Sequence, residues 1–151
     1  MAEGSRYSSY FIKEASSGVT PATGTLKIFR ATKSGLDINI ATLQSEEIRD
    51  DAEIADFRLG TRHVEGTASA ELSYETFDEL LAAALRSTFV GNVVKGGILR
   101  QSFTFIDYNA DITDFPYTIY KGCEINTIAI TVAASAMVQV EFGIVGRSME
   151  P

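Results

Sequence analysis

The sequence is poor in the residues that cross-link small proteins or hold metal ions in them. Of its 151 residues, one is cysteine, one is histidine and none is tryptophan. The single cysteine, Cys123, excludes an internal disulfide framework and a multi-cysteine metal site. Basic residues are also few, because 13 Lys and Arg stand against 20 Asp and Glu and give a net charge of −7. The composition therefore does not predict a phosphate-binding surface.

Long apolar runs are absent from the sequence as well. Nowhere do 18 consecutive apolar residues occur, so no membrane-spanning helix and no membrane partner are predicted. The opening letters, MAEGSRYSSY, lack a basic stretch followed by an apolar one. We therefore expect no secretory signal and folding in a reducing cytoplasm. The apolar fraction of 45% and charged fraction of 22% are typical of one globular domain, which we assign to 1–151.

No group of residues predicts a catalytic or metal site. His63 lies in a charged segment and has no partner at the spacing of metal ligands or of a catalytic pair. Cys123 opens an expected strand, where a free cysteine behaves as a small hydrophobic residue. The segment 107–118 begins with the Asp-x-Asn-x-Asp spacing of a calcium loop but lacks its glycine and its final glutamate,. The sequence thus predicts no enzyme and no cofactor.

Most of the chain alternates apolar and polar residues, which is the pattern of β-strands. The clearest case is 64–74, eleven residues with small or apolar side chains on one face and only polar ones on the other. Strands of this kind pack one face on a core and leave the other face free. The expected strands are 24–31, 35–43, 64–74, 98–108, 117–122, 123–133 and 137–146.

One helix, over 76–87, is expected to interrupt the strands. Thr76 and Glu79 have the spacing of a capping box at its start. One apolar stripe follows, and we expect it to pack on the sheet. The stripe consists of Phe77, Leu80, Leu81, Ala84 and Leu85.

A long charged connection, 44–63, separates two of the expected strands. A segment with so few apolar residues cannot form its own core. It can either reach a neighbouring molecule or fold back on its own subunit as a compact flap. Its charged residues are Glu46, Glu47, Arg49, Asp50, Asp51, Glu53, Asp56, Arg58 and Arg62.

Two blocks of the sequence, EIRDDAEIADFRLGTRHVEG and ELSYETFDELLAAAL, closely resemble the tail tube proteins of long-tailed bacteriophages. The opening GSRYSSYFIKEASSGVTPATGTLKIFRAT, the pair of strands around YKGCEINTIAITV and the closing VQVEFGIVG are similar to that family in the same order. The chain departs from the family at Ala52 and Glu53, where relatives carry a basic and an amide residue, and at Phe89, where tryptophan is common. Many relatives also continue into a second half.

The resemblance implies a mainly β fold, a β-sandwich with one flanking α-helix and a long loop between strands. The inner sheets of neighbouring subunits would join into a β-barrel within a ring, usually a hexamer. Stacked rings would form the tube of the virion tail, through which phage DNA passes without specific binding. The implied partners are further copies of the chain and other tail proteins, namely the tape measure, tail tip and terminator.

In such a tube, the polar strand faces would line the lumen and 44–63 would stack one ring on the next. An N-terminal arm, 1–25, is a second candidate for contact between subunits. The alternatives are a tail terminator or completion ring protein, a bacterial secretion-tube protein of the same fold, and a ligand-binding β-barrel. In a monomer, the same polar faces would simply meet solvent. The expected lumen residues are Glu65, Thr67, Ser69, Glu71, Ser73, Asp37, Asn39, Gln139 and Glu141.

Overall fold

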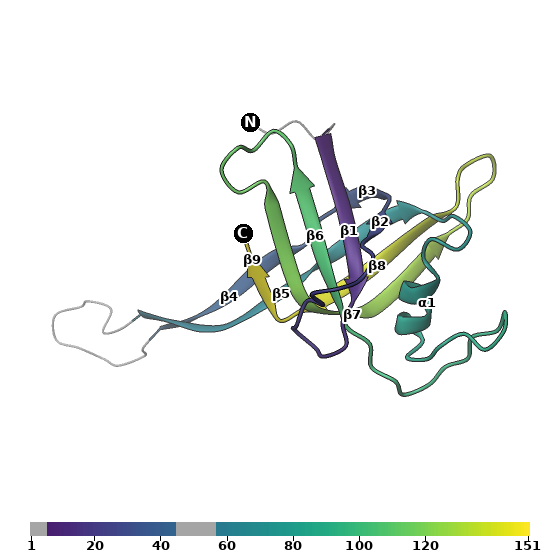
Figure 1. The fold of residues 1–151 in the computed structure, drawn as a ribbon, viewed down its shortest axis with the longest axis horizontal. Coiled ribbons are helices and arrows are strands. Elements are labelled where there is room, and N and C mark those ends of the chain that lie inside the picture. Colours follow the sequence, from purple (N-terminus) through teal and green to yellow (C-terminus); the bar gives the residue numbers. More distant parts are fainter. Residues whose placement is uncertain (1–5, 45–56) are drawn as a thin grey trace.

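The computed structural model describes residues 6–44 and 57–151, and this part of the chain is mainly β (Figure 1). It contains one helix, α1 (Asp78–Ala84), and all of its paired strands are antiparallel. The strands are β1 (Tyr7–Lys13), β2 (Lys27–Phe29), β3 (Ala31–Ser34), β4 (Asp37–Gln44), β5 (Phe57–Glu71), β6 (Phe103–Asn109), β7 (Tyr117–Thr131), β8 (Gln139–Gly146) and β9 (Ser148–Glu150).

A single sheet, in the order β2-β1-β6-β7-β8-β5-β3, folds over on itself at β7. The first part of β7, up to Cys123, pairs with β6 and β9. The second part, from Glu124, pairs with β8. We call β2, β1, β6, β9 and the first part of β7 the first half-sheet. The second half-sheet consists of the rest of β7 with β8, β5, β3 and β4, and its strands cross those of the first obliquely (Figure 1).

Aromatic side chains fill the space between the two half-sheets and α1. Phe29 lies at the centre, with its ring 5.5 Å from that of Phe77 and 6.2 Å from that of Phe142, both edge to face. Edge-to-face contacts of this kind add to the hydrophobic stabilisation from burial. Phe11 and Phe105 complete the cluster from the first half-sheet. The structure confirms the expected arrangement, a mainly β fold in two layers with one flanking helix.

Residues 57–63, expected to be part of a loop, are strand. Gln44 pairs with Phe57, and Leu43 pairs with Arg58, so β4 and β5 form a hairpin that extends far from the body of the molecule (Figure 1). The expectation was wrong for Arg58 and Arg62 because charged side chains on both faces hide a strand pattern. Backbone pairing with β4, rather than a buried face, defines the strand there.

Part of the expected N-terminal arm, 1–25, is strand. Tyr7–Lys13 forms β1, which pairs on one side with β2 and on the other with β6. Phe11 from this strand is fully buried. A strand with two neighbours and a core residue is an integral part of the subunit, so contact with another subunit stays a prediction only for the rest of the expected arm. Residues 1–5 lie outside the described part.

Helix α1 is shorter than the expected 76–87. Phe77 occupies the N-cap, and no side chain caps the helix. Thr76 instead accepts a hydrogen bond from the Ser73 hydroxyl at 2.9 Å, so the predicted capping box does not form. Phe77 and Leu80 are fully buried as expected, whereas Leu81 is only partly buried and Leu85 is exposed.

Candidate functional site

The second half-sheet turns one polar face away from the core. Along β5, Val64, Ala68 and Ala70 are buried, and the residues between them point to the opposite side. Cross-strand partners continue this side onto β4 and β8, since Asp37 pairs with Glu65 and Glu141 with Ser69. The register thus brings eight of the nine expected lumen residues together on one face, which we call the outer face: Asp37, Asn39, Glu65, Thr67, Ser69, Glu71, Gln139 and Glu141.

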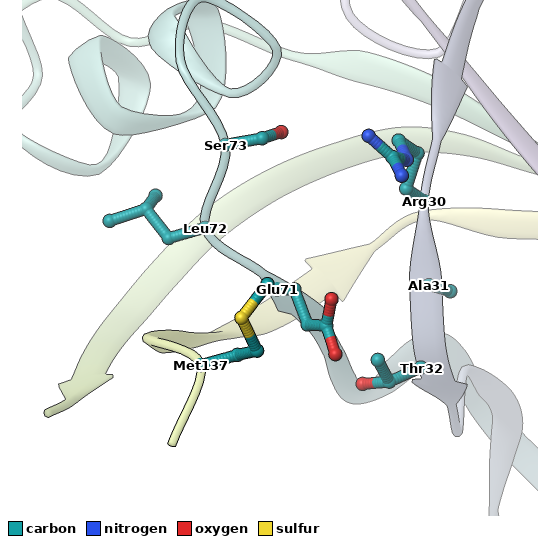
Figure 2. A pocket seen from close by; sticks show the side chains of 7 residues that line it. All are labelled: Arg30, Ala31, Thr32, Glu71, Leu72, Ser73 and Met137. Atoms are coloured by element: carbon teal, nitrogen blue, oxygen red, sulfur yellow. The ribbon is translucent and has the colours of Figure 1, made fainter. Parts of the chain in front are cut away.

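Ser73, the ninth expected residue, follows the end of β5 at Glu71. Figure 2 shows Ser73 pointing to the same side as Glu71, with Leu72 pointing away from both. The hydroxyl of Ser73 donates a hydrogen bond to Thr76, and its place in a lumen stays a prediction.

The outer face also has members on β3 and β7 that were not predicted from the sequence. Lys33 pairs with Ser69, and Ala129 pairs with Glu141. Thr127, Thr131 and Glu124 share this side through their β8 partners. A register shift between Ile125 and Thr127 breaks the alternation of β7, which is why a strict period of two does not find these residues. The pairing with the clean β8 pattern would have been the usable signal.

The outer face is acidic. Among the described residues its paired positions hold five carboxylates against one lysine, Lys33. Asn39 donates a 2.8 Å hydrogen bond to Glu65, and the His63 ring lies 3.3 Å from the other carboxylate oxygen. These contacts hold the pKa of Glu65 below its usual range,. Arg100 forms two hydrogen bonds with Glu124, at 3.0 and 3.1 Å, and offsets that carboxylate.

The second half-sheet has two open edges. Strand β6 leaves β7 at Cys123, so the second part of β7 pairs only with β8 among the described strands. At the other side, β3 and β4 each pair only with β5 in the part of the chain that the structure describes. The unpaired N–H and C=O groups along an edge strand readily form hydrogen bonds with a strand of another chain.

The hairpin of β4 and β5 carries exposed leucines as well as charge. The side chain of Leu43 is 61% exposed and that of Leu59 is 60% exposed. Arg58 and Arg62, expected in a stacking loop, lie on β5 in this hairpin. The remaining residues expected to stack fall outside the described residues: Glu46, Glu47, Arg49, Asp50, Asp51, Glu53 and Asp56.

A hollow of about 320 Å³ lies at the end of β5 opposite the hairpin (Figure 2). Figure 2 shows Glu71 pointing from β5 toward β3, with Arg30 on the β3 side of the hollow. The part of the chain that the structure describes holds no cluster of His, Cys, Asp and Glu able to bind a metal ion, and none of its helices is long and apolar enough to cross a membrane. The hollow is lined by Arg30, Ala31, Thr32, Glu71, Leu72, Ser73 and Met137.

Comparison with known proteins gives one family match and several similar folds. A family model described as phage tail tube protein matches residues 4–151, whereas no curated protein matches. A chain of the anti-feeding prophage baseplate has a TM-score of 0.63 at 9% identity, covering 99% of this chain and 94% of that one. The tail of an empty gene transfer agent particle with C6 symmetry gives a TM-score of 0.62 at 11% identity, covering 99% of this chain and 98% of that one. The SPP1 tail tube gives a TM-score of 0.58 at 10% identity, covering 99% of this chain and 77% of that one.

Proposed function

This chain belongs to the phage tail tube protein family, and we propose that it assembles into rings that stack into the tube of a virion tail. The proposal rests mainly on the second half-sheet, which has two open edges and one polar, acidic face. A lone subunit would leave both edges open to uncontrolled pairing. A ring closes every edge with the same contact, repeated around its axis.

The ring contact joins the second part of β7 in one subunit to the β3 and β4 edge of the next. Repeated around the ring, it turns the half-sheets into a closed barrel, in which one face of every strand packs on the core and the other lines the lumen. Because Val64, Ala68 and Ala70 already pack inside the subunit, the outer face is the one left for the lumen. We propose a hexamer, which is supported by the sixfold symmetry stated for the gene transfer agent tail.

The acidic lumen suits the passage of DNA. Each lysine that contacts a phosphate releases a counterion and adds affinity that depends on salt. A channel lined by carboxylates such as Glu65 and Glu141 repels the DNA backbone, so the genome slides without adhering. This role requires no catalytic step and no cofactor. Its partners are copies of the same chain, DNA in transit, and the tape measure, tail tip and terminator proteins.

The hairpin of β4 and β5 is the element that stacks the rings. It extends away from the body of the subunit (Figure 1), and an isolated two-stranded ribbon is only marginally stable in water. Contact with the next ring would cover its exposed leucines and fix its position. The charged residues of 45–56, which lie outside the described part of the chain, are expected to take part in the same contact.

Negative-stain electron microscopy and sedimentation of the purified protein test the proposal. We expect long hollow tubes that pellet at high speed, with ring-shaped end views. Single rings that do not stack would favour a tail terminator over a tube subunit. A protein that remains monomeric at high concentration would contradict ring formation.

A further inference from the structure

The stem of the hairpin carries one exposed leucine on each of its faces. Leu43 lies on the same face as its partner Arg58, whereas Leu59 pairs with Thr42 and lies on the other face. Each leucine is about three-fifths exposed. In the described part of the subunit both leucines stay largely exposed, so burial of both leucines needs a groove or two surfaces in another molecule.

The opposite end of the second half-sheet is apolar as well. Tyr74 is 90% exposed and Met137 is 66% exposed, and the backbone N–H of Leu72 donates to the carbonyl of Val138 at 2.8 Å. This bond holds the end of β5 against the start of β8. We call this surface the far-end patch. It consists of Leu72, Tyr74, Ile130, Val132 and Met137, all exposed.

The sequence around the far-end patch is unusual for a surface turn. No charged residue occurs between Glu124 and Glu141, although this stretch includes the exposed connection from β7 to β8 (Figure 1). Exposed turns normally carry polar or charged side chains, and an exposed apolar patch marks an interaction site. The hollow with Arg30 at its rim lies at the same end (Figure 2).

From these features we infer that Leu43 and Leu59 of one subunit dock on the far-end patch of a second copy in the next ring. The inference rests on the proposed tube and names the surface that receives the hairpin. Leu59 and Leu72 are thirteen residues apart along one strand direction, roughly 43 Å, so one subunit cannot bring them together. Translation of a copy along β5 does so directly. Because the two copies are related mainly by translation, this head-to-tail contact does not close into a ring and generates an open filament.

Site-directed cross-linking tests the contact in the assembled protein. The double variant Leu59→Cys, Met137→Cys is assembled and treated with a short bis-maleimide, then separated on a denaturing gel. Cys123 does not interfere, because it is fully buried and burial raises the pKa of its thiol to about 12, which leaves little reactive thiolate. We expect most of the protein on the gel to run as a ladder of trimers and longer oligomers.

Two controls make the ladder specific. Each single-cysteine variant can give dimers at most. The pair Leu59→Cys, Phe115→Cys uses a residue that is 73% exposed on the connection from β6 to β7, away from the far-end patch, and should give no ladder. Tubes without a ladder, or an equal ladder from the Phe115 pair, would overturn the inference while leaving the tube intact. Absence of tubes in the unmodified protein would overturn the proposed function itself.

A second measurement does not depend on cysteine placement. Leu59→Asp places a charge in the docked stem, and Val19→Asp is a matched control because Val19 is 61% exposed. We expect Leu59→Asp to reduce pelletable tubes at least tenfold while rings and melting temperature are retained. The Val19 variant should form tubes normally. Normal tubes from Leu59→Asp would contradict the docking.

Discussion

The carboxylate of Glu14 accepts a hydrogen bond from the backbone N–H of Gly122 at 2.9 Å and joins the end of β1 to the bend in β7. The same oxygen accepts from the Thr104 hydroxyl at 2.7 Å, and the second oxygen accepts from the Gly18 N–H at 2.8 Å. A residue only 6% exposed thereby ties three separate segments together near the point where the sheet folds over.

Glu14→Ala should destabilise the subunit by about 1–3 kcal/mol, because it leaves buried donors without an acceptor. Urea unfolding of the unassembled protein measures the change. Glu150→Gln is the matched control. Glu150 forms an exposed ion pair with Lys121, and such pairs contribute about 0–1 kcal/mol. Equal stability of Glu14→Ala and the parent would show that the three bonds do not hold the fold.

The Glu14 contribution depends on pH. Burial raises the pKa of Glu14, but hydrogen bonds from Gly122, Thr104 and Gly18 outweigh burial and hold the pKa below its ordinary value. The stabilisation is therefore complete above the pKa of the unfolded chain and is lost as pH falls through the lower folded value. The difference in stability between Glu14→Gln and the parent should shrink from pH 7 to about pH 3. A difference independent of pH would contradict this.

The pKa of Asp107 is shifted in the opposite direction from that of Glu14. Burial raises its pKa, and its Oδ1 atom is buried without a hydrogen-bond partner among the described residues. A raised folded pKa means that the acid form stabilises the fold at low pH and that this gain is lost as pH rises through the folded value. Asp107→Asn should therefore raise the melting temperature at pH 7 and have less effect near pH 3. A lower melting temperature at pH 7 would show that the carboxylate is needed in its charged form.

Leu80 is the residue of α1 on which packing depends most. Because it is fully buried in the core cluster, Leu80→Ala should cost about 2–5 kcal/mol. Leu81 only borders the cluster, so Leu81→Ala should cost less. Thermal unfolding of both variants decides the orientation of the helix, and a larger loss at Leu81 would reverse it.

A reversed charge on the outer face should make the tube adhere to DNA. Glu141→Lys introduces one lysine per subunit in the middle of that face, opposite Ser69. Tubes should still form and bind duplex DNA, with at least about tenfold weaker binding at about 200 mM than at about 50 mM salt. Asp114→Lys, the same charge change on the exposed connection from β6 to β7, is the control. Cosedimentation of DNA that is equal for both variants would place Glu141 outside the channel.

Strict alternation identified the outer face, because a buried side forces the period of two. It holds for Glu65 to Glu71, where Ala68 and Ala70 fix the buried side. The alternation does not predict a strand that has no buried face or that contains a register shift. Arg58 and Arg62 lie in a ribbon held by backbone pairing without a core, and β7 carries a register shift. Strand β1 was not predicted, because the resemblance to the family led us to expect an arm there. The full burial of Phe11 shows that this strand is part of the core.

A cryo-electron microscopy reconstruction of the assembled protein, at a resolution that shows side chains, reveals which face of the subunit lines the channel. We expect a tube in which Glu65, Thr67 and Glu141 project into the channel, with α1 on the far side of the sheet. A channel lined by another surface of the subunit, or an assembly in which these residues face the surrounding solvent, would contradict the proposed lumen.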